Sequence, residues 1–281
     1  MALKERRVAF IGAGHITAII LDNLIETGTV SPSNLIASDP DKDRLQRLSQ
    51  RYQIAMAQDN CDAVKRGDFV FINVPPQSVC DVIDDLRQGP LLENKLVVSL
   101  AAGITIDAYS CLGDRISVVR ALPNPPSQIG MGIVALAFNP YVNDEQRSEI
   151  SELFASLGES VVLAEEKINA VTALSSPAAT YLFFQSLIDA GIRAGIDRET
   201  STKVVYQTIV GAMEVWKKRQ VSPHDLLSEA STPGGISVES IFTLERYSFR
   251  AALNEAIGNA ALKATKLGDA AQRAFGCPSK D

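Results

Sequence analysis

The sequence predicts an α/β protein whose first part is a doubly wound, mostly parallel sheet and whose second part contains only helices. Short apolar runs alternate with helical stretches as far as about residue 163, which is the pattern of successive strand–helix–strand crossovers. No strand-like run follows Lys167, and long helical patterns take over. We therefore expect two domains, covering residues 1–164 and 165–281.

The expected strands are short and strongly apolar. The run DFVFINV has no polar alternation, which is typical of a strand buried on both faces of a parallel sheet. Helices are expected at Ile16–Thr27 and Arg44–Tyr52. The expected strands are Val8–Ile11, Asn34–Ser38, Asp68–Val74, Leu96–Leu100, Ile116–Arg120 and Gly132–Phe138.

The helices expected in the second part are Asn169–Ala194, Arg198–Gln220, Pro223–Ala230 and Ser237–Leu267, with a frayed tail after Gly268. Several are apolar around much of their circumference, as in TYLFFQSLIDAGI. A helix of that kind must be buried, and so few helices cannot bury one another completely. We therefore predict an all-α dimerisation domain and a homodimer, or a higher oligomer built from dimers.

Composition excludes several classes of protein. The chain has 281 residues, 46% of them hydrophobic and 21% charged, with a net charge of −6 and a pI near 5.1, and no basic stripe that would indicate a nucleic-acid partner. No run of about 18 apolar residues could form a membrane helix. The four cysteines, Cys61, Cys80, Cys111 and Cys277, fit no zinc or CxxC pattern, which indicates thiols in a reducing cytoplasm.

A glycine turn directly after the first strand predicts a dinucleotide site. In IGAGHIT, Gly12 permits a tight turn and Gly14 lets main-chain N–H groups approach a pyrophosphate at the start of the next helix. The strand–turn–helix context makes this a Rossmann-type motif, with Ala13, His15 and Ile16 in the same loop. Thr17 stands at the third glycine position, where a β-branched residue should hold the helix slightly away from the strand.

Asp39 ends the second expected strand, roughly 25 residues beyond Gly14, where an acid can bind the ribose hydroxyls of NAD. A carboxylate there would repel the 2′-phosphate of NADP. The predicted cofactor is therefore NAD(P)H, with a lean toward NADH. The alternative interpretation is that Asp39 only starts a turn with Pro40 and caps the next helix, and the sequence leaves both open.

The sequence lacks the catalytic residues of several other enzyme classes. Only His15 and His224 are present and no GxSxG occurs, so a Ser-His-Asp hydrolase is not predicted. No cluster of His, Cys and Asp predicts a metal. A β-hydroxyacid dehydrogenase needs a Lys four residues before an Asn on a helix of the second domain, but here the order is Lys167-Ile168-Asn169.

The segment STPGGISVES places a Pro233-Gly234-Gly235 turn before a long helix. Glycines leave main-chain N–H groups bare at a helix start, which suits a carboxylate, and Ser237 adds a hydroxyl beside Ile236. Taken alone, an ordinary helix start with Ser237 in its first turn is the better interpretation of this stretch.

Together these segments make the chain resemble the pyrroline-5-carboxylate reductase family. The likeness runs in order over most of the chain, and the Pro-Gly-Gly helix start that leads into LERYSFRAALNEA is its most specific part. The other segments are IGAGHIT, DFVFINVPPQ with Asn60 upstream, VVSLAAGIT, VVRALPNPPSQIGMG and AVTALSSPAATYLF.

The resemblance implies NAD(P)H-dependent hydride transfer to the C=N carbon of a five-membered imino acid, giving L-proline. It implies that Gly234, Gly235 and Ile236 hold the substrate carboxylate, and that Ser237 matches the family's catalytic threonine. It also implies that Ala101, Ala102 and Asn124 line the nicotinamide, with Ser175 beside the substrate. By the same likeness Ser38, Asp39 and Asn60 meet the adenosine ribose, and Val74 and Pro75 lie on the cofactor side.

Four departures from the family pattern leave alternatives open. Pro75 replaces a lysine, Pro125 replaces a threonine, and the segment Ser175–Tyr181 lacks two family glycines. Ile236 is bulky where the family usually has a small residue. The leading hypothesis is a pyrroline-5-carboxylate reductase of proline biosynthesis. The alternatives are a paralogous reductase of a different cyclic imino acid and a non-catalytic dinucleotide-binding protein.

Overall fold

The computed structural model describes residues 3–87 and 92–274. Cys277 and the last residues of the tail lie outside the described residues. Contacts divide the chain into two units, one formed by residues 1–175 with 258–281 and the other by Ser176–Ile257. Each unit is described below by itself.

The first unit is built on one eight-stranded sheet in the order β3-β2-β1-β4-β5-β6-β7-β8. All neighbours pair in parallel except β6 and β7, which are antiparallel, so the predicted doubly wound, mostly parallel sheet is confirmed. The strands are β1 (Val8–Ile11), β2 (Leu35–Ser38), β3 (Ala55–Met56), β4 (Phe69–Ile72), β5 (Leu96–Ser99), β6 (Ser117–Pro123), β7 (Gly132–Phe138) and β8 (Gly158–Val162).

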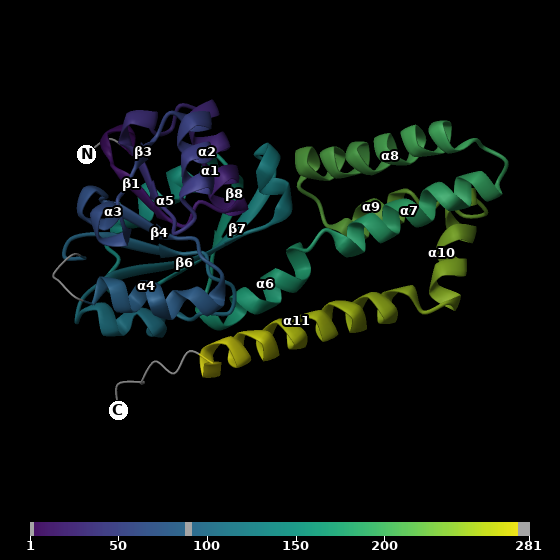
Figure 1. Ribbon diagram of the computed structural model, residues 1–281. Coiled ribbons are helices and arrows are strands. Elements are labelled where there is room, and N and C mark those ends of the chain that lie inside the picture. The colour runs from purple at the N-terminus through teal and green to yellow at the C-terminus, as the bar shows by residue number, and fades with distance from the viewer. Residues whose placement is uncertain (1–2, 88–91, 275–281) are drawn as a thin grey trace. The chain divides into compact units, whose positions relative to one another are not determined.

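Helices cover both faces of this sheet (Figure 1). Alternate strand residues point to opposite faces, so Phe10 of β1 belongs to one apolar cluster and Ile11 to the other. The Phe10 cluster includes α1 (His15–Glu26), α2 (Lys42–Tyr52) and α5 (Asp144–Ala155). The Ile11 cluster includes α4 (Val79–Leu86) and part of α3 (Asn60–Arg66).

The short helix α6 (Ile168–Ser175) is anchored to the sheet through Glu165, one turn before it. The Glu165 carboxylate accepts a hydrogen bond from the Ile106 main-chain N–H at 2.8 Å and pairs with Arg120 of β6 at 3.2 Å. Arg120 is almost fully buried, so this ion pair fixes where the chain leaves the sheet.

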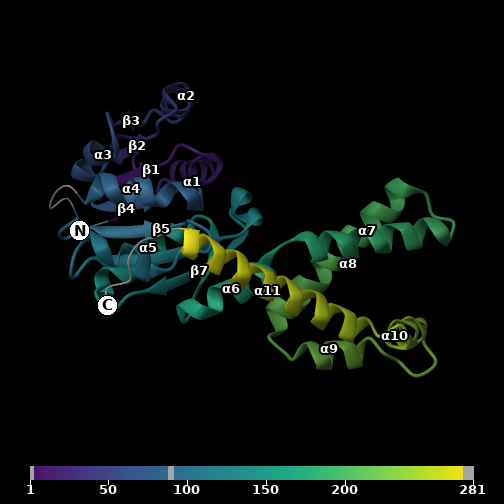
Figure 2. The same ribbon diagram turned by 60° about the horizontal axis from the view of Figure 1, so that its bottom comes forward.

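The second unit is entirely helical in its described residues. It contains α7 (Ala178–Arg193), α8 (Arg198–Arg219), α9 (Pro223–Glu229), α10 (Ile236–Arg246) and the first part of α11 (Phe249–Ala274). Helices α7 and α8 lie side by side in both views (Figures 1 and 2). Ile188 is the only hydrophobic residue of this unit that is fully buried within the chain. Many large side chains are exposed instead, among them Tyr181, Leu182, Tyr206, Met213, Phe242 and Leu253.

The structure differs from the expected elements at two strands that were not foreseen, at two helices and at the tail. The two-residue β3 is too short to give a pattern, and β8 reads GESVV, whose side chains are half-exposed or exposed rather than buried. The helix expected over Asn169–Ala194 is two helices, because Pro177 cannot continue a helical hydrogen-bond ladder. The helix expected over Ser237–Leu267 breaks at Ser248, which has a left-handed φ of 55°. The expected frayed tail instead stays helical to Ala274.

None of the helices in residues 3–87 and 92–274 is both long enough and apolar enough to cross a membrane.

Candidate active site

The glycine turn begins at Gly12, where only glycine fits. Its φ is +103°, and a Cβ placed there would lie 2.5 Å from the main-chain oxygen of Asn73. The Gly12 N–H donates to the Ser38 carbonyl at 2.8 Å, so the turn lies against the carboxyl ends of both neighbouring strands.

Gly14 is the N-cap of α1 and leaves that helix start open. No side chain caps the helix, and nothing lies within 4 Å of the place where a Cβ would be. The first N–H groups of α1 are therefore available to an anion, and the helix dipole favours negative charge there. A dinucleotide pyrophosphate fits this cradle.

Thr17 fills the third glycine position with a hydrogen-bonded side chain. Its hydroxyl is buried and donates to the Gly12 carbonyl at 2.5 Å. It also accepts a hydrogen bond from Asn73 Nδ2 at 3.1 Å. The hydroxyl thus fastens the first turn of α1 to the glycine loop and to the end of β4.

Asp39 is buried directly beyond β2 and is already engaged by the chain. Its Oδ2 accepts from the Ala13 N–H at 2.7 Å and its Oδ1 from the Asp41 N–H at 2.9 Å. Arg44 lies 3.7 Å from Oδ2. Asp39 does start the expected turn with Pro40, because its carboxylate accepts from the Asp41 N–H. The expectation that Asp39 caps α2 is wrong, because Asp41 caps that helix by accepting from the Arg44 N–H.

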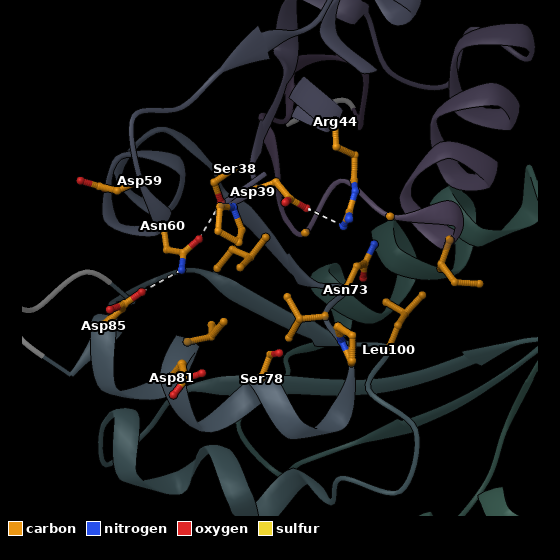
Figure 3. Close-up of a pocket in the computed structure, with 18 of the residues that line it drawn as sticks. Ser38, Asp39, Arg44, Asp59, Asn60, Asn73, Ser78, Asp81, Asp85 and Leu100 are labelled. Carbon is orange, nitrogen blue, oxygen red and sulfur yellow. Dashed lines mark hydrogen bonds and ion pairs between the residues drawn. The ribbon is translucent and has the colours of Figure 1, made fainter. Parts of the chain in front are cut away.

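Hydrogen bonds link polar side chains from the end of β2, the start of α3 and α4 (Figure 3). Ser38 Oγ donates to Asn60 Oδ1 at 2.8 Å, and Asn60 Nδ2 donates to Asp85 at 2.9 Å. Nearby, burial and the carboxylates of Asp59 and Asp85 raise the pKa of the Cys61 thiol, so it stays protonated at neutral pH.

One cleft of about 820 Å³ lies at the carboxyl ends of the parallel strands, where open α/β sheets bind ligands, and Gly12, Gly14, Asp39 and Asn60 are among the residues that line it. The cleft brings together most of the residues predicted to bind the cofactor, whereas Ala13 and Ala101 are buried and do not line it. The predicted residues that line it are Gly12, Gly14, His15, Ile16, Ser38, Asp39, Asn60, Val74, Pro75 and Ala102.

The loop with Ala101 and Ala102 is held by a buried pair behind it. Ser99 Oγ and the Tyr109 hydroxyl lie 2.6 Å apart, and the Ala101 N–H donates to Ser99 Oγ. Burial raises the pKa of Tyr109, so the phenol is neutral and the pair is a rigid support rather than an acid or base.

Asn124, predicted to line the nicotinamide, and Ser175, predicted to lie beside the substrate, are joined by a hydrogen bond. Asn124 Nδ2 donates to the Ser175 carbonyl at 3.1 Å, and its Oδ1 accepts from the Ile133 N–H at 2.8 Å. Asn124 also lines a smaller hollow of about 190 Å³ together with His15 and Ile16. The Asn124 amide therefore positions main chain at one wall of that hollow.

The predicted carboxylate site lies in the second unit. Gly234 has a φ of +70°, and Gly235 is the N-cap of α10 with no side-chain cap. The Gly235 N–H turns back to the Thr232 carbonyl at 2.9 Å. The N–H groups that follow are left for a ligand, and the side chains of Ile236 and Ser237 are exposed beside them.

Sequence reasoning missed two groups of cleft residues. Asn73 is hidden in an apolar run, and only its polarity in DFVFINV could have marked it. Lys42, Arg44, Asp81 and Asp85 lie on helices whose solvent-facing charges look ordinary in sequence. Residues 3–87 and 92–274 contain no group of three or more His, Cys, Asp or Glu that could hold a metal.

Comparison with known proteins finds family models that match both parts of the chain. Residues 165–267 match the family model described as pyrroline-5-carboxylate reductase dimerisation. Residues 7–103, which contain the glycine turn, match the model described as NADP oxidoreductase coenzyme F420-dependent. The pyrroline-5-carboxylate reductase of Corynebacterium melassecola is 33% identical over 267 residues, which are 93% of this chain and 98% of that protein. This chain belongs to the pyrroline-5-carboxylate reductase family.

Other members of the pyrroline-5-carboxylate reductase family agree in length and fold. The Escherichia coli enzyme is 30% identical, over 94% of this chain and 98% of its own length. The Coxiella burnetii structure matches with a TM-score of 0.86 at 27% identity, covering 93% and 98% of the two chains. The Plasmodium falciparum structure, described with NADP bound, matches with a TM-score of 0.82 at 27% identity, covering 95% and 99%.

Proposed function

We propose that this chain reduces 1-pyrroline-5-carboxylate to L-proline with NAD(P)H, as an enzyme of proline biosynthesis. The observation that carries the proposal is the cleft of about 820 Å³ around Gly12 and Gly14 in a chain that matches pyrroline-5-carboxylate reductases over nearly its full length. The open glycine cradle and the hydrogen-bonded side chains from Ser38 to Asp85 suit a pyrophosphate and a ribose.

The chemistry asks the chain mainly to position the imine. A reduced nicotinamide would supply a hydride to the C=N carbon and be oxidised to NAD(P)+, while the nitrogen takes a proton. The C=N double bond thereby becomes a C–N single bond with one new C–H and one new N–H bond. We assign the turn at Gly234 and Gly235, with the unbonded N–H groups that follow it from Ile236 onward, to the substrate carboxylate. Ser237 is the proposed catalytic hydroxyl at the imine nitrogen.

We assign the remaining roles to residues of the first unit. The cleft residues described above, from Gly12 to Pro75, hold the pyrophosphate and the adenosine half. Ala101 and Ala102 lie on the nicotinamide side, with Ala101 acting through its main chain because its side chain is buried. Asn124 and the Ser175 main chain that it holds form the wall nearest the reacting ring.

We propose that NADH is preferred to NADPH. The carboxylates of Asp39, Asp59, Asp81 and Asp85 line the same cleft, and they would repel a 2′-phosphate. The two cations that could offset this charge are already engaged, because Lys42 donates to the Gln58 carbonyl and Arg44 pairs with Asp39 and Asp41. The Plasmodium falciparum structure contains NADP, but that chain is only 27% identical to this one, so its cofactor does not decide the preference here.

We propose that the second unit forms a homodimer, or a higher oligomer of dimers. Its helices expose Tyr181, Met213 and Phe242, and apolar surface on this scale gains free energy when a partner covers it. The match of residues 165–267 to a dimerisation model supports the same assignment. A dinucleotide-binding part at 1–164, a dimerisation part at 165–281 and a cytoplasmic location complete the proposal.

A paralogous imine reductase is the second candidate, favoured by two departures from the family pattern. Pro75 lines the cleft where the family has a lysine, and Pro177 makes the helix beside Ser175 end and restart. Both changes alter walls near the expected reaction site, so a different ring size or substituent would be accommodated there.

The test is NADH consumption by the full chain with 1-pyrroline-5-carboxylate, beside six-membered and substituted cyclic imino acids. The leading proposal expects the highest kcat/KM with 1-pyrroline-5-carboxylate. A higher kcat/KM with a six-membered imine would favour the second candidate. Turnover of none of these imines, although NADH binds, would contradict both.

A further inference from the structure

Asn73, the residue directly after β4, carries a buried oxygen that has no partner. Its Oδ1 atom is shielded from solvent and makes no hydrogen bond with any residue that the structure describes. The other end of the same amide is engaged, because Nδ2 donates to Thr17 Oγ1 at 3.1 Å. Asn73 lines the dinucleotide cleft on the far side from Asn60 and Asp85 (Figure 3).

The orientation of the Asn73 amide follows from its neighbour. A threonine hydroxyl has one proton, and that of Thr17 is given to the Gly12 carbonyl. Toward Asn73 the hydroxyl can therefore only accept, so the amide nitrogen must face it. The amide oxygen is left on the other side as an acceptor, fixed by two successive hydrogen bonds to the glycine turn.

A buried acceptor without a donor costs free energy, and such atoms persist mainly where a ligand or an ordered water supplies the donor. An amide oxygen repels a phosphate, so the pyrophosphate itself is excluded as its partner. Within the dinucleotide, the donor has to be a neutral group that carries an O–H or N–H.

Sheet order indicates which group this is. Strand β1 lies between β2 and β4, so Asp39 beyond β2 and Asn73 beyond β4 lie on opposite sides of the glycine turn. With pyrophosphate on that turn and the adenosine ribose toward Asp39, the chain of the cofactor continues toward Asn73. The first donors beyond the pyrophosphate in that direction are the hydroxyls of the second ribose.

We propose that Asn73 Oδ1 accepts a hydrogen bond from a hydroxyl of the nicotinamide-side ribose, and that Thr17 is the positioning residue that orients the amide. The inference rests on the proposed dinucleotide binding and extends it to residues that the family resemblance does not assign. It gives the Thr17 side chain, in place of the third glycine, a purpose in the binding of the cofactor.

The test is calorimetric binding of NADH, ADP-ribose and ADP to the full chain and to Asn73→Ala. ADP-ribose contains the second ribose but no nicotinamide, and ADP contains neither. Loss of one hydrogen bond should weaken NADH and ADP-ribose by about 3- to 30-fold and leave ADP within about twofold. As a matched control, Asn60→Ala on the adenosine side should weaken all three ligands alike.

A second pair of variants tests the positioning role without removing the amide. Thr17→Val should weaken ADP-ribose relative to ADP, while Thr17→Ser should restore the wild-type ratio. Equal effects of Asn73→Ala on ADP and ADP-ribose, or no effect on either, would overturn the inference. A loss confined to NADH would also overturn it, because the donor would then be on the nicotinamide. Failure of the wild-type chain to bind any of the three would instead overturn the proposed function.

Discussion

The Oδ2 atom of Asp39 accepts a hydrogen bond from the main-chain N–H of Ala13 at 2.7 Å. This contact ties the end of β2 to the glycine turn that follows β1, so one carboxylate both shapes the loop and contributes negative charge to the cleft. Removing it should therefore change which dinucleotide is bound as well as how tightly.

We predict that Asp39→Ser raises the ratio of kcat/KM with NADPH to kcat/KM with NADH by about tenfold, because the buried negative charge no longer opposes a 2′-phosphate. Affinity for both cofactors should fall, since the Ala13 N–H loses its acceptor. Steady-state kinetics with each cofactor measures the ratio. Asp81→Asn removes a charge from the same cleft without touching the turn, and it should move the ratio less. An unchanged ratio in Asp39→Ser would make Asp39 only a structural residue.

The two glycines of the turn should respond differently to alanine. Gly12→Ala places a Cβ 2.5 Å from the main-chain oxygen of Asn73, at a φ of +103°. The free energy of unfolding should therefore drop by about 1–3 kcal/mol or more. Gly14→Ala meets nothing within 4 Å, so its Tm should stay near that of the wild type. Its methyl group instead enters the pyrophosphate cradle, and NADH affinity should fall by about tenfold. Thermal melting and NADH titration separate the two, and equal loss of stability in both variants would contradict this account of the turn.

Ser237→Ala should lower kcat/KM for the imine by roughly 10- to 1,000-fold, the cost of one lost transition-state hydrogen bond. The Kd for NADH should change little, because the cofactor cleft is built from other residues. Ser240→Ala is the matched control, since Ser240 is also exposed and its hydroxyl only returns to the Ile236 carbonyl. Unchanged turnover in Ser237→Ala would remove this hydroxyl from the mechanism.

Glu165→Ala should destabilise the first unit by about 3 kcal/mol, because Arg120 is almost fully buried and loses its carboxylate partner. The Ile106 N–H loses its acceptor at the same time. Chemical denaturation measures the difference in the free energy of unfolding. Glu166→Ala, an exposed neighbour, should change it by less than about 0.5 kcal/mol. A similar loss of unfolding free energy in both variants would show that the buried ion pair of Glu165 with Arg120 does not contribute to stability.

The sequence predicted the parts of the fold that follow local periodicity. The apolar runs at Val8–Ile11 and Phe69–Ile72 are strands because both of their faces are covered, and continuous hydrophobicity reports that directly. The strand Gly158–Val162 lies at the edge of the sheet with exposed or half-exposed residues, so it lacks the continuous apolar run that identifies a buried strand. The helix break at Ser248 depends on a left-handed backbone conformation, and the sequence has no glycine there to indicate it.

The candidate site was predicted where a motif carries its own context. Gly12 and Gly14 were recognisable from the strand before them and the helix after them. Asn73 was not, because its role depends on the Thr17 hydroxyl, and that contact spans 56 positions in the chain. Arg44 was missed for a similar reason, since its pairing with Asp39 appears only when α2 folds back over β2.

The central claim is that this chain moves a hydride from nicotinamide to the carbon of an imino acid held at the start of α10. The most direct measurement is turnover of 1-pyrroline-5-carboxylate with NADH deuterated at one or the other C4 position of the nicotinamide ring, followed by NMR of the product. The account predicts L-proline that carries one deuterium at C5 with one of the two labelled cofactors and none with the other. Proline without deuterium from either cofactor, or no proline at all from a chain that binds NADH, would contradict it.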